Sequence, residues 1–271
     1  MFDISTLSIK EKFKLYSRGI IDIKDLPKNF PLSPSQKLQV DCEIDEKPHI
    51  NREEIQNFLS KINYPLYFLD FEAFQEPIPL FDKIKPYQQL PFQFSLHYIE
   101  EPNWNGNLSE VLKHEEFLAK TGTDPREEIA SNLVRLIPEN ASVLCYDKSF
   151  EKLIIKGLAS DFPQYKEKLL NINKNLLDMM TPFREMHLYK REMKGRHSIK
   201  AVLPALVPEL RYDELAVSNG RAACTAYAKL SRIDNKEEIE RLSKGLLEYC
   251  KLDTFAMVKI LEKLYEIVSE K

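Results

Sequence analysis

The segment from Tyr64 to Glu72 constrains the fold of this chain more than any other part of the sequence. In an extended chain, successive side chains project to opposite faces. The apolar residues of one face are Leu66 and Phe68, and those of the other are Tyr67, Leu69 and Phe71. A strand that is apolar on both faces is typical of the centre of a sheet covered on both sides. The sequence therefore predicts an α/β domain built on this strand.

The other predicted elements place strands early and helices late. Further strands are expected near 92–99, 111–117 and 142–146, the first of them paired antiparallel with 64–72. Helical periodicity and caps predict helices at 8–18, 51–62, 124–137, 148–160, 163–172, 176–190, 198–206, 220–231 and 236–268. This order predicts one mixed sheet flanked by helices. We divide the chain into a small N-terminal helical extension, 1–60, and a main domain, 61–271.

Composition excludes several classes of protein. The chain has 271 residues, of which 43% are hydrophobic and 30% charged, as is typical of soluble globular proteins. No apolar run approaches the roughly 20 residues that a membrane span requires. The segment from Met1 to Lys12 lacks the apolar core of a signal peptide. We therefore expect a cytoplasmic protein that has no membrane partner.

The spacing of cysteines and glycines excludes further classes. The four cysteines form no CxxC pair: Cys42, Cys145, Cys224 and Cys250. This spacing suits neither a zinc site nor a disulfide framework, so reduced thiols are expected. None of the seven glycines forms the GxGxxG or GxxxxGK[ST] pattern. The usual signatures of dinucleotide and P-loop nucleotide binding are therefore absent.

The formal net charge of −3 provides no global basic field, so a nucleic-acid partner would require a local basic patch. The segment 187–200 contains five cations and a single acid, Glu192. The cations are Lys190, Arg191, Lys194, Arg196 and Lys200. This segment is a candidate for contacts with a phosphate backbone. The alternative interpretation is a solvated basic turn.

Asp70 and Glu72 are the first of three unusual acidic sites. Two positions apart on a strand, they project from the face that also carries Leu66 and Phe68. Adjacent carboxylates at the end of a buried strand repel each other unless a cation neutralises them. The alternative is that the strand reaches the surface here and that both acids are solvated.

Asp253 is the second unusual acid. It interrupts the apolar stripe of the last predicted helix, and Tyr249 lies one turn earlier on the same face. A charge inside an apolar stripe is costly unless it has a partner. The alternative is a position at the edge of the stripe, where Asp253 still reaches water.

Glu151 is the third. It follows Phe150 in the first turn of a predicted helix, directly after the strand predicted at 142–146. Functional groups of α/β folds are often placed at such strand-to-helix junctions. The alternative is an ordinary surface glutamate that the helix dipole favours.

In this order, the three sites resemble the motifs of the DEDD superfamily of exonucleases. That superfamily carries D-x-E at the end of its first strand, N-x-x-F-D after a middle strand, and Y-x-x-x-D on a late helix. The corresponding segments are Asp70-Phe71-Glu72, Asp147-Lys148-Ser149-Phe150-Glu151 and Tyr249-Cys250-Lys251-Leu252-Asp253. The second motif departs from the pattern, since Asp147 replaces the usual Asn and Glu151 the usual Asp. Position 248 is Glu, not the His of the histidine-type motif, so the tyrosine-type subclass matches better.

Three segments also look like a bacterial domain-of-unknown-function family that is assigned to the ribonuclease-H-like superfamily. These segments are 64–72, 86–97 and 195–200, and the similarity covers roughly residues 15–268. An acid and a glutamate are usual in the second motif of that family. Some of its members carry a further N-terminal domain with cysteines, which implies that this chain is a fragment or a short member.

The resemblance implies a ribonuclease-H-like mixed β-sheet flanked by helices, and a 3′–5′ exonuclease that uses two Mg²⁺ or Mn²⁺ ions. Asp70, Glu72 and Asp253 would bind one ion, Asp70 would bridge to the second, and Glu151 would hold the second through water. Tyr249 would orient the attacking water, because a phenol of pKa about 10 is a poor base. The expected partner is the 3′-end of DNA or RNA.

Two other functions stay open at this point. One is a catalytically weak or inactive ribonuclease-H-like module that binds nucleic acid or a partner protein, which the glutamate at position 151 and the acidic net charge would suit. The other is a metal phosphoesterase that acts on small nucleotides.

Overall fold

The computed structural model describes residues 1–101, 108–212 and 215–270, which divide into two compact units. Unit 1 comprises Met1–Lys61, Met180–Leu210 and Lys263–Lys271, and unit 2 comprises Ile62–Met179 and Arg211–Glu262. The expected N-terminal extension, residues 1–60, falls within unit 1. That unit also takes in two later segments of the chain.

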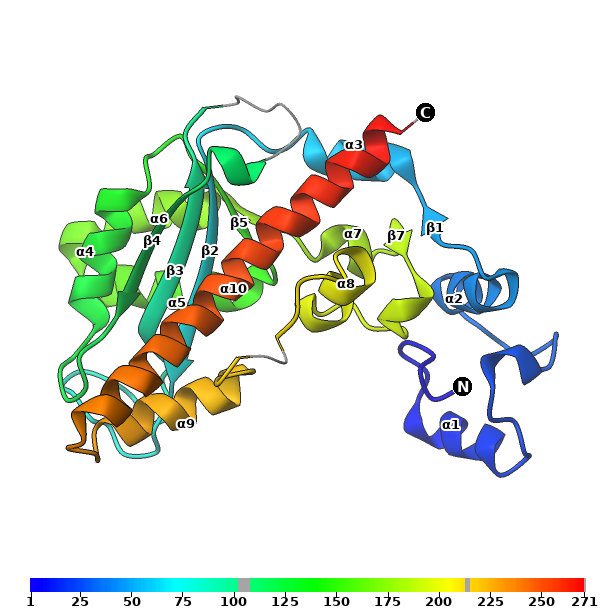
Figure 1. Ribbon diagram of the computed structural model, residues 1–271, viewed down its shortest axis with the longest axis horizontal. Coiled ribbons are helices and arrows are strands. Elements are labelled where there is room, and N and C mark those ends of the chain that lie inside the picture. The colour runs from blue at the N-terminus through cyan, green and yellow to red at the C-terminus, as the bar shows by residue number, and fades with distance from the viewer. Residues whose placement is uncertain (102–107, 213–214, 271) are drawn as a thin grey trace. The chain divides into compact units, whose positions relative to one another are not determined.

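Unit 2 contains the predicted mixed sheet (Figure 1). Its strands are β2 (Leu66–Phe74), β3 (Leu90–Ile99), β4 (Lys113–Leu118), β5 (Ser142–Cys145) and β6 (Leu176–Asp178). They lie in the order β4-β3-β2-β5-β6, so β2 is the central strand. It pairs antiparallel with β3 and parallel with β5, and β6 is parallel to β5. The prediction of an α/β fold with a mixed sheet and a central first strand is confirmed.

One face of the sheet is covered by three helices, α4 (Arg126–Leu136), α5 (Lys148–Asp161) and α6 (Lys166–Lys174). Their apolar residues form a single core with the side chains of Leu69 and Phe71. These side chains belong to the second of the two predicted faces of β2. The main hydrophobic core of unit 2 therefore lies on the face opposite Asp70 and Glu72.

The other face of the sheet is covered by α9 (Gly220–Leu230) and α10 (Lys236–Ser269). In Figure 1, α10 crosses in front of the strands, and α9 lies near their lower ends. Tyr227 of α9 stacks on Phe92 of β3 with 4.1 Å between ring centroids, and Phe74 of β2 lies 5.7 Å from the same ring. Aromatic stacking and area burial together hold α9 against the sheet.

The prediction of a helix at 176–190 was wrong. The segment contains the short strand β6, helix α7 (Thr181–Arg184) and strand β7 (Leu188–Tyr189). Pairing with β5 satisfies the backbone of β6, and Pro182 lies in the first turn of α7, where no N–H is needed. The apolar residues of this segment have helical spacing, but the pairing of β6 with β5, which is distant in sequence, determines its conformation.

Unit 1 is mostly helical. Its elements are α1 (Ile9–Tyr16), η1 (Ile23–Asp25), α2 (Pro34–Asp45), β1 (His49–Ile50), α3 (Arg52–Leu59), α7, β7, η4 (Arg191–Met193) and α8 (Ile199–Leu206). Strand β1 pairs antiparallel with β7. The sequence did not indicate α2, which begins with a capping box between Ser33 and Gln36. Unit 2 also has two 3₁₀ turns, η2 (Leu108–Glu110) and η3 (Pro163–Tyr165).

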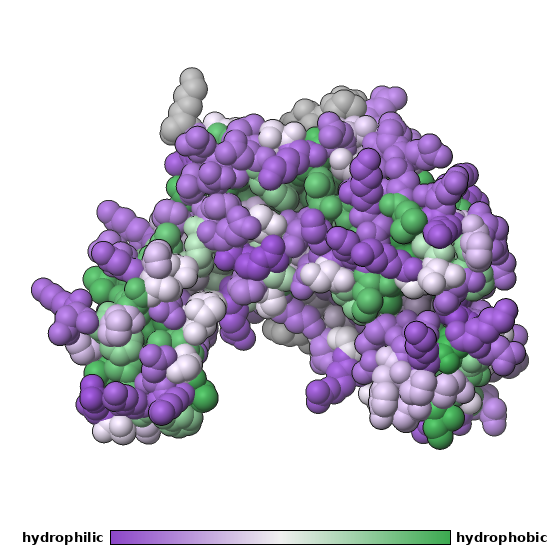
Figure 2. All heavy atoms as spheres, turned by 180° about the vertical axis from the view of Figure 1, so that it is seen from behind, coloured by the Kyte–Doolittle hydropathy of each residue, from purple (hydrophilic) through white to green (hydrophobic). Residues whose placement is uncertain are grey.

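Within the described ranges, no helix combines the length and apolar character that crossing a bilayer requires. On the face that Figure 2 shows, hydrophobic residues form separate areas among hydrophilic ones.

Candidate metal centre

Three of the predicted carboxylates meet on the face of the sheet that α10 covers. One ligand oxygen from each of Asp70, Glu72 and Asp253 lies within 4.8 Å of the other two. The alternation of β2 brings the first two to the same face, and α10 supplies the third. Asp253 and Glu72 are each 8% exposed, and Asp70 is partly buried. The alternative interpretation, two solvated acids at the surface, does not apply.

Glu151 reaches the same region from the first turn of α5. The carboxylate of Asp147 caps this helix by accepting from the backbone N–H of Ser149 at 3.1 Å. Glu151 itself is only 4% exposed, and its Oε2 has no hydrogen-bond partner. A buried carboxylate oxygen without a partner is costly, so this oxygen is an available donor for a cation.

The electrostatics of the cluster oppose ionisation. Burial, and then the charges of Asp253, Glu151 and Glu72, raise the pKa of Asp70 well above its ordinary value. Burial is also the largest cause that raises the pKa of Glu151 to about 8, with Asp147 next among the neighbouring carboxylates. Among the described residues, no lysine or arginine pairs with Asp70 or Glu151. Burial and mutual repulsion therefore both oppose the ionisation of Asp70 and Glu151.

Two tyrosines flank Asp253. The hydroxyl of Tyr212 donates to Asp253 Oδ1 at 2.6 Å, and a hydrogen bond also links Tyr249 to Asp253. The two rings lie 6.3 Å apart. Burial, followed by the charge of Asp253, raises the pKa of both hydroxyls above the ordinary tyrosine value. Both therefore keep their protons at neutral pH and act as hydrogen-bond donors.

The sequence reasoning missed two residues of this region, Asp178 and Tyr212. Asp178 ends β6 beside Cys145, is buried, and contributes to the raised pKa of Glu151. The Leu-Asp pair that ends β6 repeats the pair Leu69-Asp70 within β2 and could have identified it. Tyr212 lies in an irregular segment, and no sequence pattern marks it.

The N-terminus of α9 approaches Glu72 closely. A Cβ added to Gly220 would lie 3.4 Å from Glu72 Oε2, which places the first residue of α9 beside this carboxylate. One turn later, the thiol of Cys224 donates to the carbonyl oxygen of Ala73 at 3.1 Å. Helix α9 therefore contacts both Glu72 of the carboxylate cluster and the backbone of Ala73.

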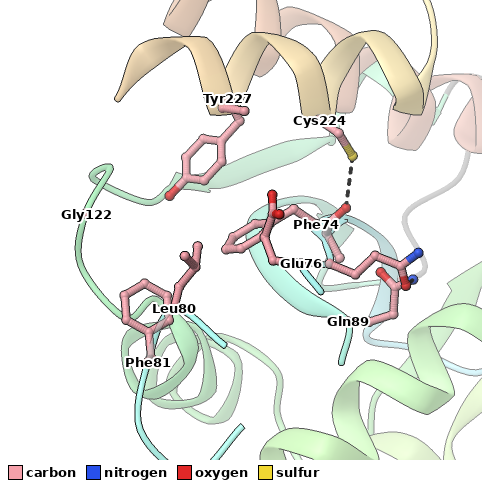
Figure 3. Close-up of a pocket in the computed structure, with 11 residues that line it drawn as sticks. Phe74, Glu76, Leu80, Phe81, Gln89, Gly122, Cys224 and Tyr227 are labelled. Atoms are coloured by element: carbon pink, nitrogen blue, oxygen red, sulfur yellow. Dashed lines mark hydrogen bonds between the residues drawn. The ribbon is translucent and has the colours of Figure 1, made fainter. Parts of the chain in front are cut away.

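A pocket of about 480 Å³ adjoins Ala73, and Asp70, Glu72, Glu151 and Asp253 are not among its lining residues. Its apolar side chains are those of Ala73, Phe74, Leu80, Phe81, Cys224, Tyr227 and Ala228. In Figure 3, Tyr227 and Cys224 extend from α9, with Leu80 and Phe81 on the opposite side. Gln75 and Gln89 also line it, and the side-chain amide of Gln89 donates to that of Gln75 at 2.9 Å. The pocket thus offers aromatic surface with amide groups beside it.

The predicted basic residues belong to unit 1, whereas the carboxylates belong to unit 2. Lys190 donates to the backbone carbonyl of Ala205, and Arg191 forms ion pairs with Glu43 and Glu46. These two cations are therefore occupied within their own unit. The side chains of the other three, Lys194, Arg196 and Lys200, are exposed.

The chemistry of the donor set suits a hard divalent cation. All four predicted ligands offer carboxylate oxygens, which Mg²⁺ and Mn²⁺ prefer, whereas structural zinc sites use cysteine and histidine. The unpartnered oxygen of Glu151 adds an available donor beside the triad. The residues present therefore fit such ions.

Part of the chain is similar to a protein family. Residues 67–198 match the family model "Domain of unknown function (DUF2779)". The matched region contains Asp70, Glu72 and Glu151 and ends before Tyr249 and Asp253.

Two curated relatives are similar over a longer stretch. They are the uncharacterised protein MG366 of Mycoplasma genitalium, 23% identical over 80% of this chain, and its homologue in Mycoplasma pneumoniae, 24% identical over 74%. The aligned parts are 34% and 32% of those proteins, so the chain spans about a third of their length. No solved structure matches.

Proposed function

We propose that unit 2 is a ribonuclease-H-like nuclease domain and that the protein is a two-metal-dependent 3′–5′ exonuclease acting on DNA or RNA. One observation carries the proposal: ligand oxygens of Asp70, Glu72 and Asp253 converge within 4.8 Å of one another, and the buried, unpartnered Oε2 of Glu151 belongs to the same region. The mixed sheet flanked by helices and the motif order support the same assignment.

Each of the two ions would be held by a different set of the four carboxylates. Asp70, Glu72 and Asp253 would hold one ion, and Asp70 with Glu151 the second. Two such ions, when bound, lower the pKa of a water and stabilise the leaving oxygen of an in-line displacement. Without the ions, burial and the neighbouring carboxylates raise the pKa of Asp70 and of Glu151 and so disfavour the charged form of both ligands.

Tyr249 contributes by orientation. Because burial and the neighbouring carboxylates raise its pKa, its hydroxyl keeps its proton and cannot accept one from water. It holds the Asp253 carboxylate by a hydrogen bond and presents its oxygen to the attacking water. Tyr212 fixes the same carboxylate at Oδ1.

The apolar pocket beside Glu72 would receive the base of the terminal nucleotide. Nucleobases stack on aromatic side chains regardless of sequence, and Phe74 and Tyr227 supply such surface. The exposed cations Lys194, Arg196 and Lys200 are candidates for contacts with the phosphate backbone.

The proposal is tested with 5′-labelled single-stranded DNA and RNA oligonucleotides and Mn²⁺ or Mg²⁺. We expect products that shorten by one nucleotide at a time from the 3′-end, and no products with EDTA or in Asp253→Asn. Cleavage that persists in Asp253→Asn would contradict the assignment. Binding without cleavage would instead support the nucleic-acid-binding module, and cleavage of dinucleotides alone would support a small-nucleotide phosphoesterase.

The pocket is tested separately by Phe74→Ala. Loss of one base–aromatic stack is expected to reduce kcat/KM by about 5- to 150-fold, which corresponds to about 1–3 kcal/mol. Mn²⁺ affinity should not change, because Phe74 holds no carboxylate. The matched control is Leu170→Ala, which removes a 42% exposed apolar side chain on α6. Equal kcat/KM in Phe74→Ala and Leu170→Ala would show that the pocket does not bind the substrate.

A further inference from the structure

Three polar residues of β3 share a face of the sheet with the carboxylates. In the β2–β3 register, Glu72 lies opposite Gln93, and Asp70 lies opposite Ser95. His97 follows at the next position of the same face. The side chains are 0%, 0% and 3% exposed, respectively. None of them belongs to the proposed metal centre.

All three make hydrogen bonds to α10. Gln93 Nε2 donates to the carbonyl oxygen of Leu246 at 2.8 Å. Ser95 Oγ lies 2.8 Å from Thr254 Oγ1, and His97 Nδ1 lies 2.7 Å from the same oxygen. Thr254 is fully buried. These contacts form a polar seam, Gln93–Leu246 and Ser95/His97–Thr254, between the sheet and the helix that carries Tyr249 and Asp253.

We propose that the polar seam sets the rotation and axial position of α10 on the sheet, and that Thr254 is thereby the positioning residue for Asp253 and Tyr249. This inference rests on the proposed function, since it concerns the same carboxylates. Thr254 adjoins Asp253 in sequence, so its two hydrogen bonds to β3 fix where the Asp253 carboxylate points. Leu246 anchors the helix two turns earlier, on the other side of Tyr249.

Apolar packing alone would not define this position. Most buried residues of α10 are apolar, among them Met257 and Ile260, and hydrophobic contact has no direction. Helices packed only by such contacts tolerate small shifts, whereas a buried polar pair is satisfied in one register. Cys250 adds a further weak contact, its thiol donating to Asp70 Oδ2 at 3.5 Å. The seam therefore supplies the directional part of the interface.

The test is Mn²⁺ affinity of the full chain, measured by calorimetry, in Thr254→Val, Thr254→Ser and Met257→Leu. Thr254→Val keeps the shape but loses both hydrogen bonds, and we expect Mn²⁺ to bind about 10- to 100-fold more weakly, as when partners that orient ligands are removed. Thr254→Ser should restore binding because it keeps the hydroxyl. Met257→Leu perturbs the same buried helix face without touching the seam and should bind as the wild type does.

Wild-type affinity in Thr254→Val would overturn the inference, as would equal losses in Thr254→Val and Met257→Leu. If the wild type itself binds no Mn²⁺, the proposed metal centre is wrong. Crystal structures of the same variants then test separately whether Thr254 positions Asp253. In Thr254→Val, the distance between the Tyr212 hydroxyl and Asp253 Oδ1 should then exceed the 2.6 Å of the wild type. An unchanged distance would overturn the inference without any metal.

Discussion

Replacing Asp70 with asparagine is expected to reduce Mn²⁺-dependent cleavage by more than about 100-fold, because even residues that only support metal ligands commonly contribute about 10- to 100-fold. Asparagine preserves the size of the side chain and removes the charge that would bridge the two ions. The measurement is the initial rate of mononucleotide release at saturating Mn²⁺.

The same substitution is expected to stabilise the metal-free protein. Asp70 faces Asp253, Glu151 and Glu72, and burial adds to this repulsion, so a neutral amide removes an unfavourable charge. We expect the free energy of unfolding in EDTA to rise by roughly 1–2 kcal/mol, as in other active sites that are held at a cost in stability.

The matched control for both measurements is Asp82→Asn, which neutralises an exposed acid of the same unit. It should change neither the cleavage rate nor the stability. A stable, fully active Asp70→Asn variant would remove Asp70 from the metal centre. A variant that is inactive and less stable would instead indicate a structural role for this carboxylate.

The stability of the metal-free protein is expected to fall as the pH rises from about 4.5 to about 8. Burial raises the pKa of Glu151 to about 8, so the folded state retains a proton that the unfolded state releases near pH 4.5. Folding is therefore favoured below the unfolded pKa, and this advantage is lost as the pH approaches the folded pKa. The shift corresponds to roughly 2–5 kcal/mol.

This dependence is measured by chemical denaturation in EDTA at a series of pH values. Glu151→Gln should flatten the slope, since the amide does not titrate, whereas Glu139→Gln, at an exposed glutamate, should leave it unchanged. Saturating Mn²⁺ should reverse the trend in the wild type, because the ions stabilise the ionised carboxylates. A flat profile for the metal-free wild type would show that Glu151 is solvated in solution.

The sequence predicted those parts of the fold and site that depend on local periodicity. Alternation along Tyr64–Glu72 was enough to identify the central strand and to place Asp70 and Glu72 on one face. The apolar stripe of the last helix was enough to mark Asp253 as an inward-facing acid. In both cases the side-chain direction follows from a regular repeat of several residues.

The missed features depend on contacts between distant segments. Strand β6 has three residues, too few for a period of two to be distinguished from helical spacing, and its pairing with β5 is visible only in the fold. Asp178 was missed for that reason. The hydrogen bond of Tyr212 to Asp253 joins residues 41 positions apart and has no local signal. The hydrogen bond of Gln93 to the carbonyl of Leu246 joins residues 153 positions apart and likewise has no local signal.

The polar seam limits how α10 can vary in length during evolution. A single residue inserted between Leu246 and Thr254 would turn the two anchor points by about 100° relative to each other, so β3 could no longer bond to both. Insertions before Leu246 or after Thr254 leave the spacing of the anchors intact. Natural length differences, and sites chosen for grafted segments or fluorescent labels, are therefore expected outside this two-turn interval.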